Sequence, residues 1–282
     1  MLYSDAHLHV NPISGLGAER IARKFKSTGG WFLSIISLPP HYYGFVEPSI
    51  ESYRKVLDLL IREASRAREQ GVIVAVFMGF HPAEVDYYYK MGVKADKLSG
   101  IVDEVFKIIE DALRTGLIDG IGEVGRPHYG TSPERFVFSE TIMVKAINLV
   151  RDYDVPIQLH TEQGGYATAY SVRQLVDLLK IPVSRIILHH ASFQTATWSD
   201  FFGLPFTAPI KQFDEKYASH KWSNCMVESD FLDDPNRPGV SAYPWEIPST
   251  VRKLIESGVL SEEEVYRIMV DNIVRFFRVK PP

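Results

Sequence analysis

Tyr3-Ser4-Asp5-Ala6-His7-Leu8-His9-Val10 stands at the start of this chain of 282 residues, and its apolar alternation predicts a β-strand. Alternate side chains of a strand share a face, so Asp5, His7 and His9 point the same way. Two imidazoles held side by side on a rigid strand form half of a divalent metal site. A His-x-His pair also occurs on strands that bind no metal, so this interpretation requires further ligands downstream.

Apolar, β-branched runs alternate with runs of helical period along most of the chain. The expected strands cover residues 2–10, 31–36, 72–78, 118–124, 156–160, 185–190, 201–207 and 225–230. The seventh is placed at 201–207 because the strand count requires one there. The expected helices cover residues 18–27, 48–71, 97–114, 134–151, 171–180, 211–222, 248–258 and 261–277. Eight β/α units in a chain of this length favour a (β/α)₈ TIM barrel, regular or distorted, as a single domain over residues 1–282. A doubly wound open sheet is the alternative.

Residues able to bind a metal end most of the predicted strands. They are His7 and His9, His81, Glu123, His160, His189 and His190, and Asp230. A barrel collects its catalytic residues from the C-terminal ends of many strands, whereas an open sheet usually binds its ligand at one switch point. The placement of these residues therefore favours the barrel over the open sheet.

The same segments resemble, in order, motifs of the TatD-type metal-dependent hydrolases of the amidohydrolase superfamily. The matching segments are Asp-x-His-x-His at 5–9, Gly-x-His-Pro at 79–82, Ile-Gly-Glu-x-Gly at 121–125, Pro-x-x-x-His at 156–160, an element similar to Glu-Thr-Asp at 228–230 and Asn-x-x-x-Phe at 272–276. Each motif is weak alone, but together they cover nearly the whole chain. The resemblance implies a hydrolase that uses metal-bound hydroxide, similar to TatD-type deoxyribonucleases.

The resemblance also implies a site of one or two divalent ions. His7 and His9 would hold one ion, Glu123 would bridge, and His160 with one histidine of the sixth strand would hold the second. Imidazole and carboxylate donors suit Zn²⁺, Mn²⁺, Co²⁺ or Ni²⁺, with Mg²⁺ as a further candidate. Such an ion lowers the pKa of its bound water to about 7. Asp230 would contact the metal and accept the water's proton, so Glu123 and Asp230 are the expected catalytic residues.

The histidine of the sixth strand is open to two alignments. If that strand is regular, His189 and His190 point to opposite faces. Some relatives have two hydrophobic residues, any residue and then histidine, which fits 187–190 and favours His190. The His-Cys-Phe of TatD proteins can instead be aligned on His189. The expected ligand is His190.

Departures from the family motifs fall around the expected substrate. The usual Glu-x-Gly-Leu-Asp is replaced at 123–127, and the usual His-x-Arg at 160–162 reads His-Thr-Glu. Arg126 would supply a positive group for a phosphate or carboxylate, or else form an ion pair at the surface. His81, in the Gly-x-His-Pro motif, is expected to face the substrate. The predicted substrate-binding residues are therefore His81 and Arg126.

The amino-acid composition limits which partners and which compartment can be expected for the protein. The net charge is -4, so nucleic acid would need a local basic patch rather than a global attraction. The single cysteine, Cys225, allows no intrachain disulfide, which predicts a cytoplasmic protein. No apolar run of the sequence is long enough to span a bilayer. The chain enters a strand at once, which leaves no room for a signal peptide. Three hypotheses remain: a nuclease, a hydrolase of a small ester, lactone, amide or phosphoester, and a non-catalytic binding barrel.

Overall fold

The structure is a computed structural model that describes residues 1–237 and 241–281. Eight parallel strands form one sheet in chain order. They are β1 (Tyr3–His9), β2 (Gly30–Ile36), β3 (Ile73–Met78), β4 (Gly120–Gly125), β5 (Ile157–His160), β6 (Ile186–Leu188), β7 (Phe206–Pro209) and β8 (Cys225–Glu228). The sheet closes beyond β8, where the Asp230 amide donates to the His7 carbonyl at 3.0 Å and the His9 amide to the Phe231 carbonyl at 2.7 Å. The predicted (β/α)₈ barrel is confirmed, and the open sheet is excluded.

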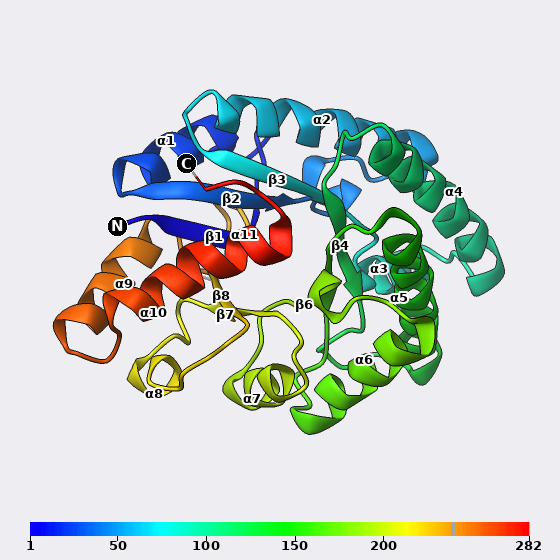
Figure 1. The fold of residues 1–282 in the computed structure, drawn as a ribbon. Helices are drawn as coiled ribbons and strands as arrows, with labels where there is room; N and C mark the ends of the chain where they lie inside the picture. The colour runs from blue at the N-terminus through cyan, green and yellow to red at the C-terminus, as the bar shows by residue number, and fades with distance from the viewer. Residues whose placement is uncertain (238–240, 282) are drawn as a thin grey trace.

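Helices follow the strands and surround the barrel (Figure 1). They are α1 (Ala18–Ser27), η1 (Pro40–Tyr43), α2 (Ile50–Arg68), α3 (Pro82–Lys90), α4 (Ala95–Arg114), α5 (Pro133–Tyr153), α6 (Tyr166–Leu179), η2 (Val183–Arg185), α7 (Phe193–Phe201), α8 (Glu215–Ala218), α9 (Glu246–Glu256), α10 (Glu262–Tyr266), η3 (Arg267–Asp271) and α11 (Asn272–Phe277). Within the described residues, no helix combines the length and apolarity that a membrane crossing needs.

The core lies on both faces of the sheet. Every residue of β1 and of β2 is buried, as expected of parallel strands covered by helices. The helices contribute apolar stripes, such as Ile21, Ala22 and Phe25 of α1. Burying one large apolar side chain contributes about 1.5–3 kcal/mol, so this packing holds the strand ends in fixed positions.

The seventh strand begins later than predicted and shares only residues 206–207 with the expected 201–207. Helix α7 occupies 193–201, and β7 begins only at Phe206. Gly203, at φ 72°, ends the helix, with its amide donating to the Asp200 carbonyl at 3.0 Å. The aromatic pair at 201–202 resembles a strand in sequence, but Phe201 is exposed at the end of a helix. The expected helix at 211–222 shortens to α8.

The sixth strand also ends earlier than predicted. β6 stops at Leu188, so His189 and His190 both lie beyond it. His190 has φ 42°, a left-handed conformation that turns the chain. The two imidazole rings therefore lie at the same end of the barrel, with centroids 4.2 Å apart, instead of on opposite faces of a strand.

Candidate metal centre

The two histidines of β1 turn their Nε2 atoms toward each other. His7 Nδ1 donates to the side-chain oxygen of Gln158 at 2.5 Å, and His9 Nδ1 donates to the Ile36 carbonyl at 3.0 Å. Since a neutral imidazole carries one proton, each Nε2 is left with a lone pair. The two Nε2 atoms lie 3.4 Å apart. Asp5 lies behind them and accepts the amides of His7 and Ser229.

Glu123, on β4, lies at the centre of the group. Its Oε1 is 3.4 Å from His7 Nε2 and 3.1 Å from His9 Nε2. Its Oε2 is 2.8 Å from His160 Nδ1 and 3.5 Å from His189 Nε2. Burial alone would raise the pKa of Glu123, but the surrounding imidazoles, His189 foremost, hold it well below its usual range. An ionised carboxylate thus faces one set of imidazoles with each oxygen.

His189 is buried and fixed on its far side. Its Nδ1 lies 2.8 Å from Oε2 of Glu228, the last residue of β8, and its ring stacks on His7 with centroids 3.6 Å apart. Its Nε2 is left facing Glu123. The ring of His190 points toward His128 instead, with its Nε2 3.1 Å from Nδ1 of His128. The distances favour His189 beside Glu123, and the expected role of His190 stays a prediction.

Asp230 follows β8 and faces the histidines of β1. Ligand atoms of His7, His9 and Asp230 all lie within 4.8 Å of one another. Asp230 Oδ1 is also 3.9 Å from His189 Nε2. Burial raises the pKa of Asp230 to about 7, although the nearby His9 opposes this rise. Its carboxylate is therefore poised to take up a proton near neutral pH.

Of the two predicted substrate-binding residues, only His81 lies beside the centre. Its Nδ1 accepts the Ala83 amide at 3.0 Å and caps α3, so the proton is on Nε2, which lies 3.5 Å from Glu123 Oε2. Arg126 is buried in an ion pair instead, with two bonds of 2.7 and 2.8 Å to Glu162. Its guanidinium also reaches Glu140 at 3.3 Å.

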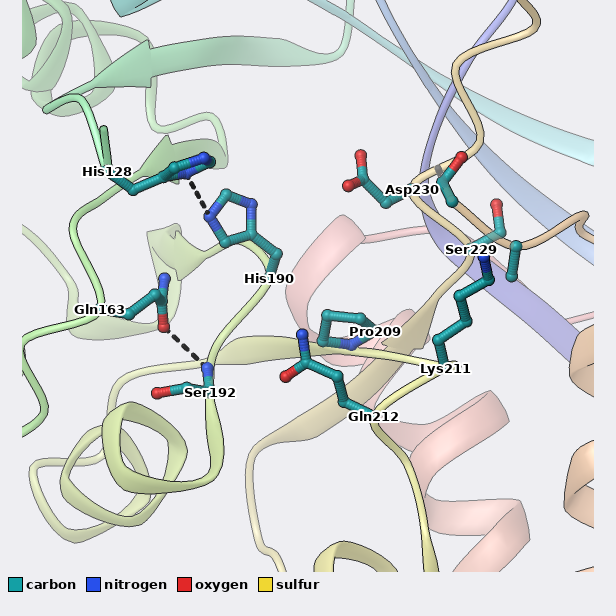
Figure 2. A pocket seen from close by; sticks show the side chains of 11 residues that line it. His128, Gln163, His190, Ser192, Pro209, Lys211, Gln212, Ser229 and Asp230 are labelled. Atoms are coloured by element: carbon teal, nitrogen blue, oxygen red, sulfur yellow. Dashed lines mark hydrogen bonds between the residues drawn. The ribbon is translucent and has the colours of Figure 1, made fainter. Parts of the chain in front are cut away.

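Two pockets open onto these residues. One, of about 250 Å³, is lined by the centre itself and by apolar or aromatic side chains, among them Leu38, Pro39, Tyr42 and Leu232. The other, of about 380 Å³, lies between the histidines and the chain after β7. Figure 2 shows it with His128 and His190 on one side and Asp230 on the other. Substrate thus has room on more than one side of Asp230.

The donors fit divalent cations. In the neutral rings, the Nε2 lone pairs of His7 and His9 face each other and the Glu123 carboxylate, an arrangement that a cation would stabilise. Buried atoms without a hydrogen-bond partner among the described residues include His160 Nε2, Asp5 Oδ2 and Glu228 Oε1. Neutral imidazole with carboxylate suits Zn²⁺, Mn²⁺, Co²⁺ and Ni²⁺.

Sequence reasoning missed the residues that orient the ligands. Gln158 and Glu228 each fix a histidine ring, and His128 contacts His190. The signal was present for Gln158, since it lies two residues before His160 and shares its strand face. Glu228 lies two residues before Asp230, but Asp230 is beyond the end of β8 and has φ 53°, so strand periodicity does not relate the two. His128 follows a turn after β4 and has no comparable periodicity.

Comparisons with known proteins agree over nearly the whole chain. A family model described as TatD related DNase matches residues 4–278. An uncharacterized protein of Methanocaldococcus jannaschii, MJ1127, is 29% identical over 278 residues, which cover 97% of this chain and 95% of that protein. The TatD-like protein AF1765 of Archaeoglobus fulgidus superposes with a TM-score of 0.66 at 19% identity, covering 98% of this chain and 100% of that one. The TatD homolog YJJV of Escherichia coli gives a TM-score of 0.67 at 15% identity, with 99% and 98% covered.

Proposed function

The chain belongs to the TatD related DNase family and is a metal-dependent hydrolase, and from this premise we propose that it hydrolyses phosphodiester bonds. The observation that carries the proposal is the placement of Glu123 between two sets of imidazoles. A carboxylate with one oxygen toward each set suits a pair of divalent ions. Paired ions stabilise both the attacking and the leaving oxygen in a displacement at phosphorus.

Seven residues are proposed for the metal centre. His7, His9 and Asp230 would hold one ion, His160 and His189 the other, and Glu123 would bridge them, with His190 as the alternative to His189. When bound, the ions would supply Lewis acidity and an activated water at neutral pH.

The protein's own groups would orient the substrate and move the proton. Asp230 would accept the proton of the attacking water at a carboxylate oxygen, since it follows β8 beside the ligand atoms of His7 and His9. His81 holds a proton on Nε2 and would donate a hydrogen bond to a substrate oxygen beside Glu123. Arg126 as a substrate-binding residue stays a prediction, since its guanidinium is engaged with Glu162.

A second candidate is the hydrolysis of a small carboxylic ester or lactone. The pocket over the centre favours it, because about 250 Å³ accommodates a small molecule and several of its walls are apolar. A DNA strand would need cations along its path, and the overall charge of -4 supplies no general attraction. We also propose a cytoplasmic location, because a chain with one cysteine forms no intrachain disulfide.

The test is a substrate panel on protein stripped by a chelator and reloaded with Mn²⁺, Co²⁺, Zn²⁺ or Mg²⁺. The panel holds single-stranded DNA, duplex DNA, bis(p-nitrophenyl) phosphate, p-nitrophenyl acetate and a γ-lactone. We expect phosphodiester turnover to return with the ion and to exceed carboxylic ester turnover. Ester or lactone turnover without phosphodiester turnover would establish the second candidate, and no turnover at all would favour the binding barrel.

A further inference from the structure

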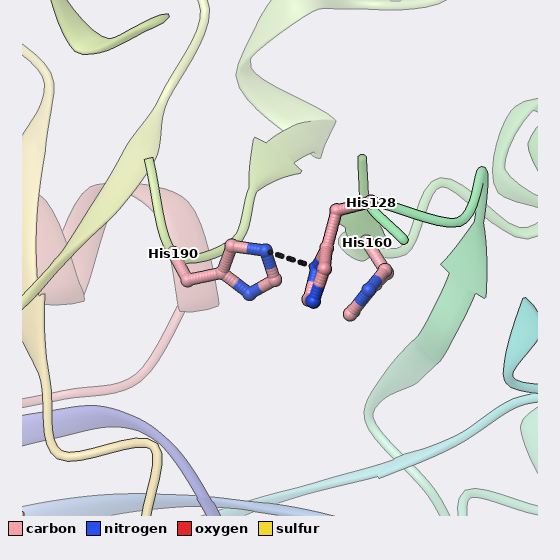
Figure 3. A group of neighbouring side chains, drawn as sticks. All are labelled: His128, His160 and His190. Carbon is pink, nitrogen blue, oxygen red and sulfur yellow. Dashed lines mark hydrogen bonds between the residues drawn. The ribbon is translucent and has the colours of Figure 1, made fainter. Parts of the chain in front are cut away.

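A second group of imidazoles lies at the edge of the centre and shares His160 with it, and it includes His190, the alternative ligand to His189. His128 follows β4, His160 ends β5 and His190 follows β6, and Figure 3 shows the three rings together. The rings of His128 and His160 stack with centroids 4.6 Å apart and an angle of 24°. The ring of His190 stands edge-on to that of His160, with centroids 4.7 Å apart.

The spacing of the ring nitrogens matches that of ligands on one cation. His128 Nδ1 and His190 Nε2 lie 3.1 Å apart. Two nitrogens on one tetrahedral zinc ion, each at about 2.0–2.1 Å, are about 3.3–3.4 Å from each other. One ring nitrogen from each of the three residues lies within 4.8 Å of the other two. An ion among them would already have one pair at ligand spacing and would draw His160 toward that pair from at most 4.8 Å.

The hydrogen bonding of His160 also suits a metal. His160 Nδ1 donates to the ionised Glu123, so its Nε2 carries a lone pair, and this atom is buried without a hydrogen-bond partner among the described residues. A ring nitrogen with a free lone pair is the form that binds metals.

We propose that His128, His190 and His160 bind a further transition-metal cation, outside the Glu123 centre. Three imidazoles suit Zn²⁺, Co²⁺, Ni²⁺ or Cu²⁺ rather than Mg²⁺ or Ca²⁺. The pocket of about 380 Å³, lined by His128 and His190, gives the ion an open side for water or a substrate oxygen. The proposed function places His189 beside Glu123, with His190 as its alternative, and this inference goes beyond it by assigning His190 to a further ion together with His128.

His160 links the two sites. Its Nδ1 faces Glu123, and its Nε2 is the nitrogen left for the further ion. A ring that holds ions at both nitrogens is an imidazolate, so its one N–H proton passes to solvent when the second ion binds. The two sites are therefore expected to influence each other's affinity.

Cobalt is the probe for the test. Metal-free protein is equilibrated with Co²⁺ by dialysis, and bound cobalt per chain is counted by elemental analysis. The variant is His128→Gln and the matched control is His220→Gln, which alters an exposed histidine that contacts Trp222 with ring centroids 4.0 Å apart. We expect the wild type and the control to bind one ion more per chain than His128→Gln. Equal binding by all three overturns the inference.

Two further measurements separate this inference from the proposed function. The variant Glu123→Gln is expected to lose ions of the main centre yet keep the ion that His128→Gln loses. If Glu123→Gln binds as much cobalt as the wild type, the proposed function fails, whereas the inference still stands on His128. If a variant does not fold, anomalous diffraction from cobalt-soaked wild-type crystals decides. A peak beside His128 Nδ1 and His190 Nε2 supports the inference, and peaks confined to Glu123 overturn it.

Discussion

Several histidines of the centre are fixed at one ring nitrogen by the fold and present the other to Glu123. Gln158 fixes His7, the Ile36 carbonyl fixes His9, and Glu228 contacts His189. Partners of this kind set the tautomer and the direction of a ligand, and their loss typically costs 10–100-fold in metal affinity or activity. The centre therefore depends on side chains beyond its own ligands.

The two adjacent histidines after β6 can be told apart by activity. We expect His189→Gln to lower kcat for a phosphodiester by about 100-fold or more, because its Nε2 faces Glu123. The variant His190→Gln should cost less than about 10-fold, since that ring contacts His128 instead. Steady-state kinetics with saturating Mn²⁺ measures both. The reverse order of effects would support the sequence-based choice of His190.

The role of the Asp230 carboxylate, which follows β8, is tested by replacing it with an amide. We expect Asp230→Asn to lower kcat by about 10²–10⁴-fold, because an amide cannot accept the proton of the attacking water. The control is Asp177→Asn, an exposed residue of α6 that pairs with Arg173 at 2.8 Å. Turnover of bis(p-nitrophenyl) phosphate by both variants gives the result. Activity of Asp230→Asn close to that of the control would remove Asp230 from the proposed proton transfer.

At the scale of elements, the strand ends do most to build the centre, and the sequence predicted them well. Period and composition located β1 to β5 and β8, so Glu123 and His160 fell at the right end of the barrel. The predictions were less accurate for β6 and β7. Phe201-Phe202 has strand-like residues but ends a helix, because tertiary packing and Gly203 override local preference. The turn at His190 depends on a left-handed backbone that composition does not reveal.

Helix α3 was missed, although its start carries a recognisable sign. Pro82 is its first residue, His81 caps it, and Glu84 returns a hydrogen bond to the His81 amide at 2.9 Å. Glu84 is buried and also accepts the hydroxyl of Tyr53. The start of α3 thereby holds His81 beside the centre.

The burial of Glu84 predicts a stability that depends on pH. Burial raises the pKa of Glu84 from 4.5 to about 7, so the folded chain keeps a proton that the unfolded chain has released between those values. Stability therefore falls as pH rises from about 4.5 to about 7, by roughly 3 kcal/mol for this group. We expect Glu84→Gln to lack this fall when urea unfolding is followed at several pH values with chelator present.

The matched control for that experiment is Glu134→Gln. Glu134 also lies in the first turn of a helix and accepts a tyrosine hydroxyl, that of Tyr89 at 2.8 Å, but it is exposed. Its pH profile should follow that of the wild type. Parallel profiles for Glu84→Gln and the wild type would contradict the role given to Glu84.

At the scale of the molecule, the barrel brings together residues that are far apart in the chain. The Asp230 amide donates to the His7 carbonyl where the sheet closes, and ligand atoms of the two side chains lie within 4.8 Å of each other. Glu123 comes from the opposite part of the strand order. The order of the family motifs predicted this assembly from the sequence. The pairing of His128 with His190 was not predicted, because it depends on how two turns meet.

Metal binding by an assembled centre should stabilise the whole barrel. A ligand at 100 times its Kd stabilises the folded state by about 2.7 kcal/mol. For a chain of this size, each kcal/mol shifts Tm by roughly 2–4 °C. We expect Mn²⁺ or Zn²⁺ to raise the Tm of chelated protein by several degrees in a calorimetric scan, and Glu123→Gln to show a smaller rise. An unchanged wild-type Tm at saturating ion would argue against a preformed centre.

The most direct test is phosphodiester turnover by chelated protein during a titration with Mn²⁺, with Glu123→Gln measured in parallel. The wild type is predicted to be inactive without the ion and to gain activity until the centre is saturated. Glu123→Gln is predicted to stay at least about 100-fold lower throughout, because the carboxylate that faces both sets of imidazoles is lost. Full activity of the chelated wild type, or equal activity of the variant, would contradict a metal centre built on Glu123.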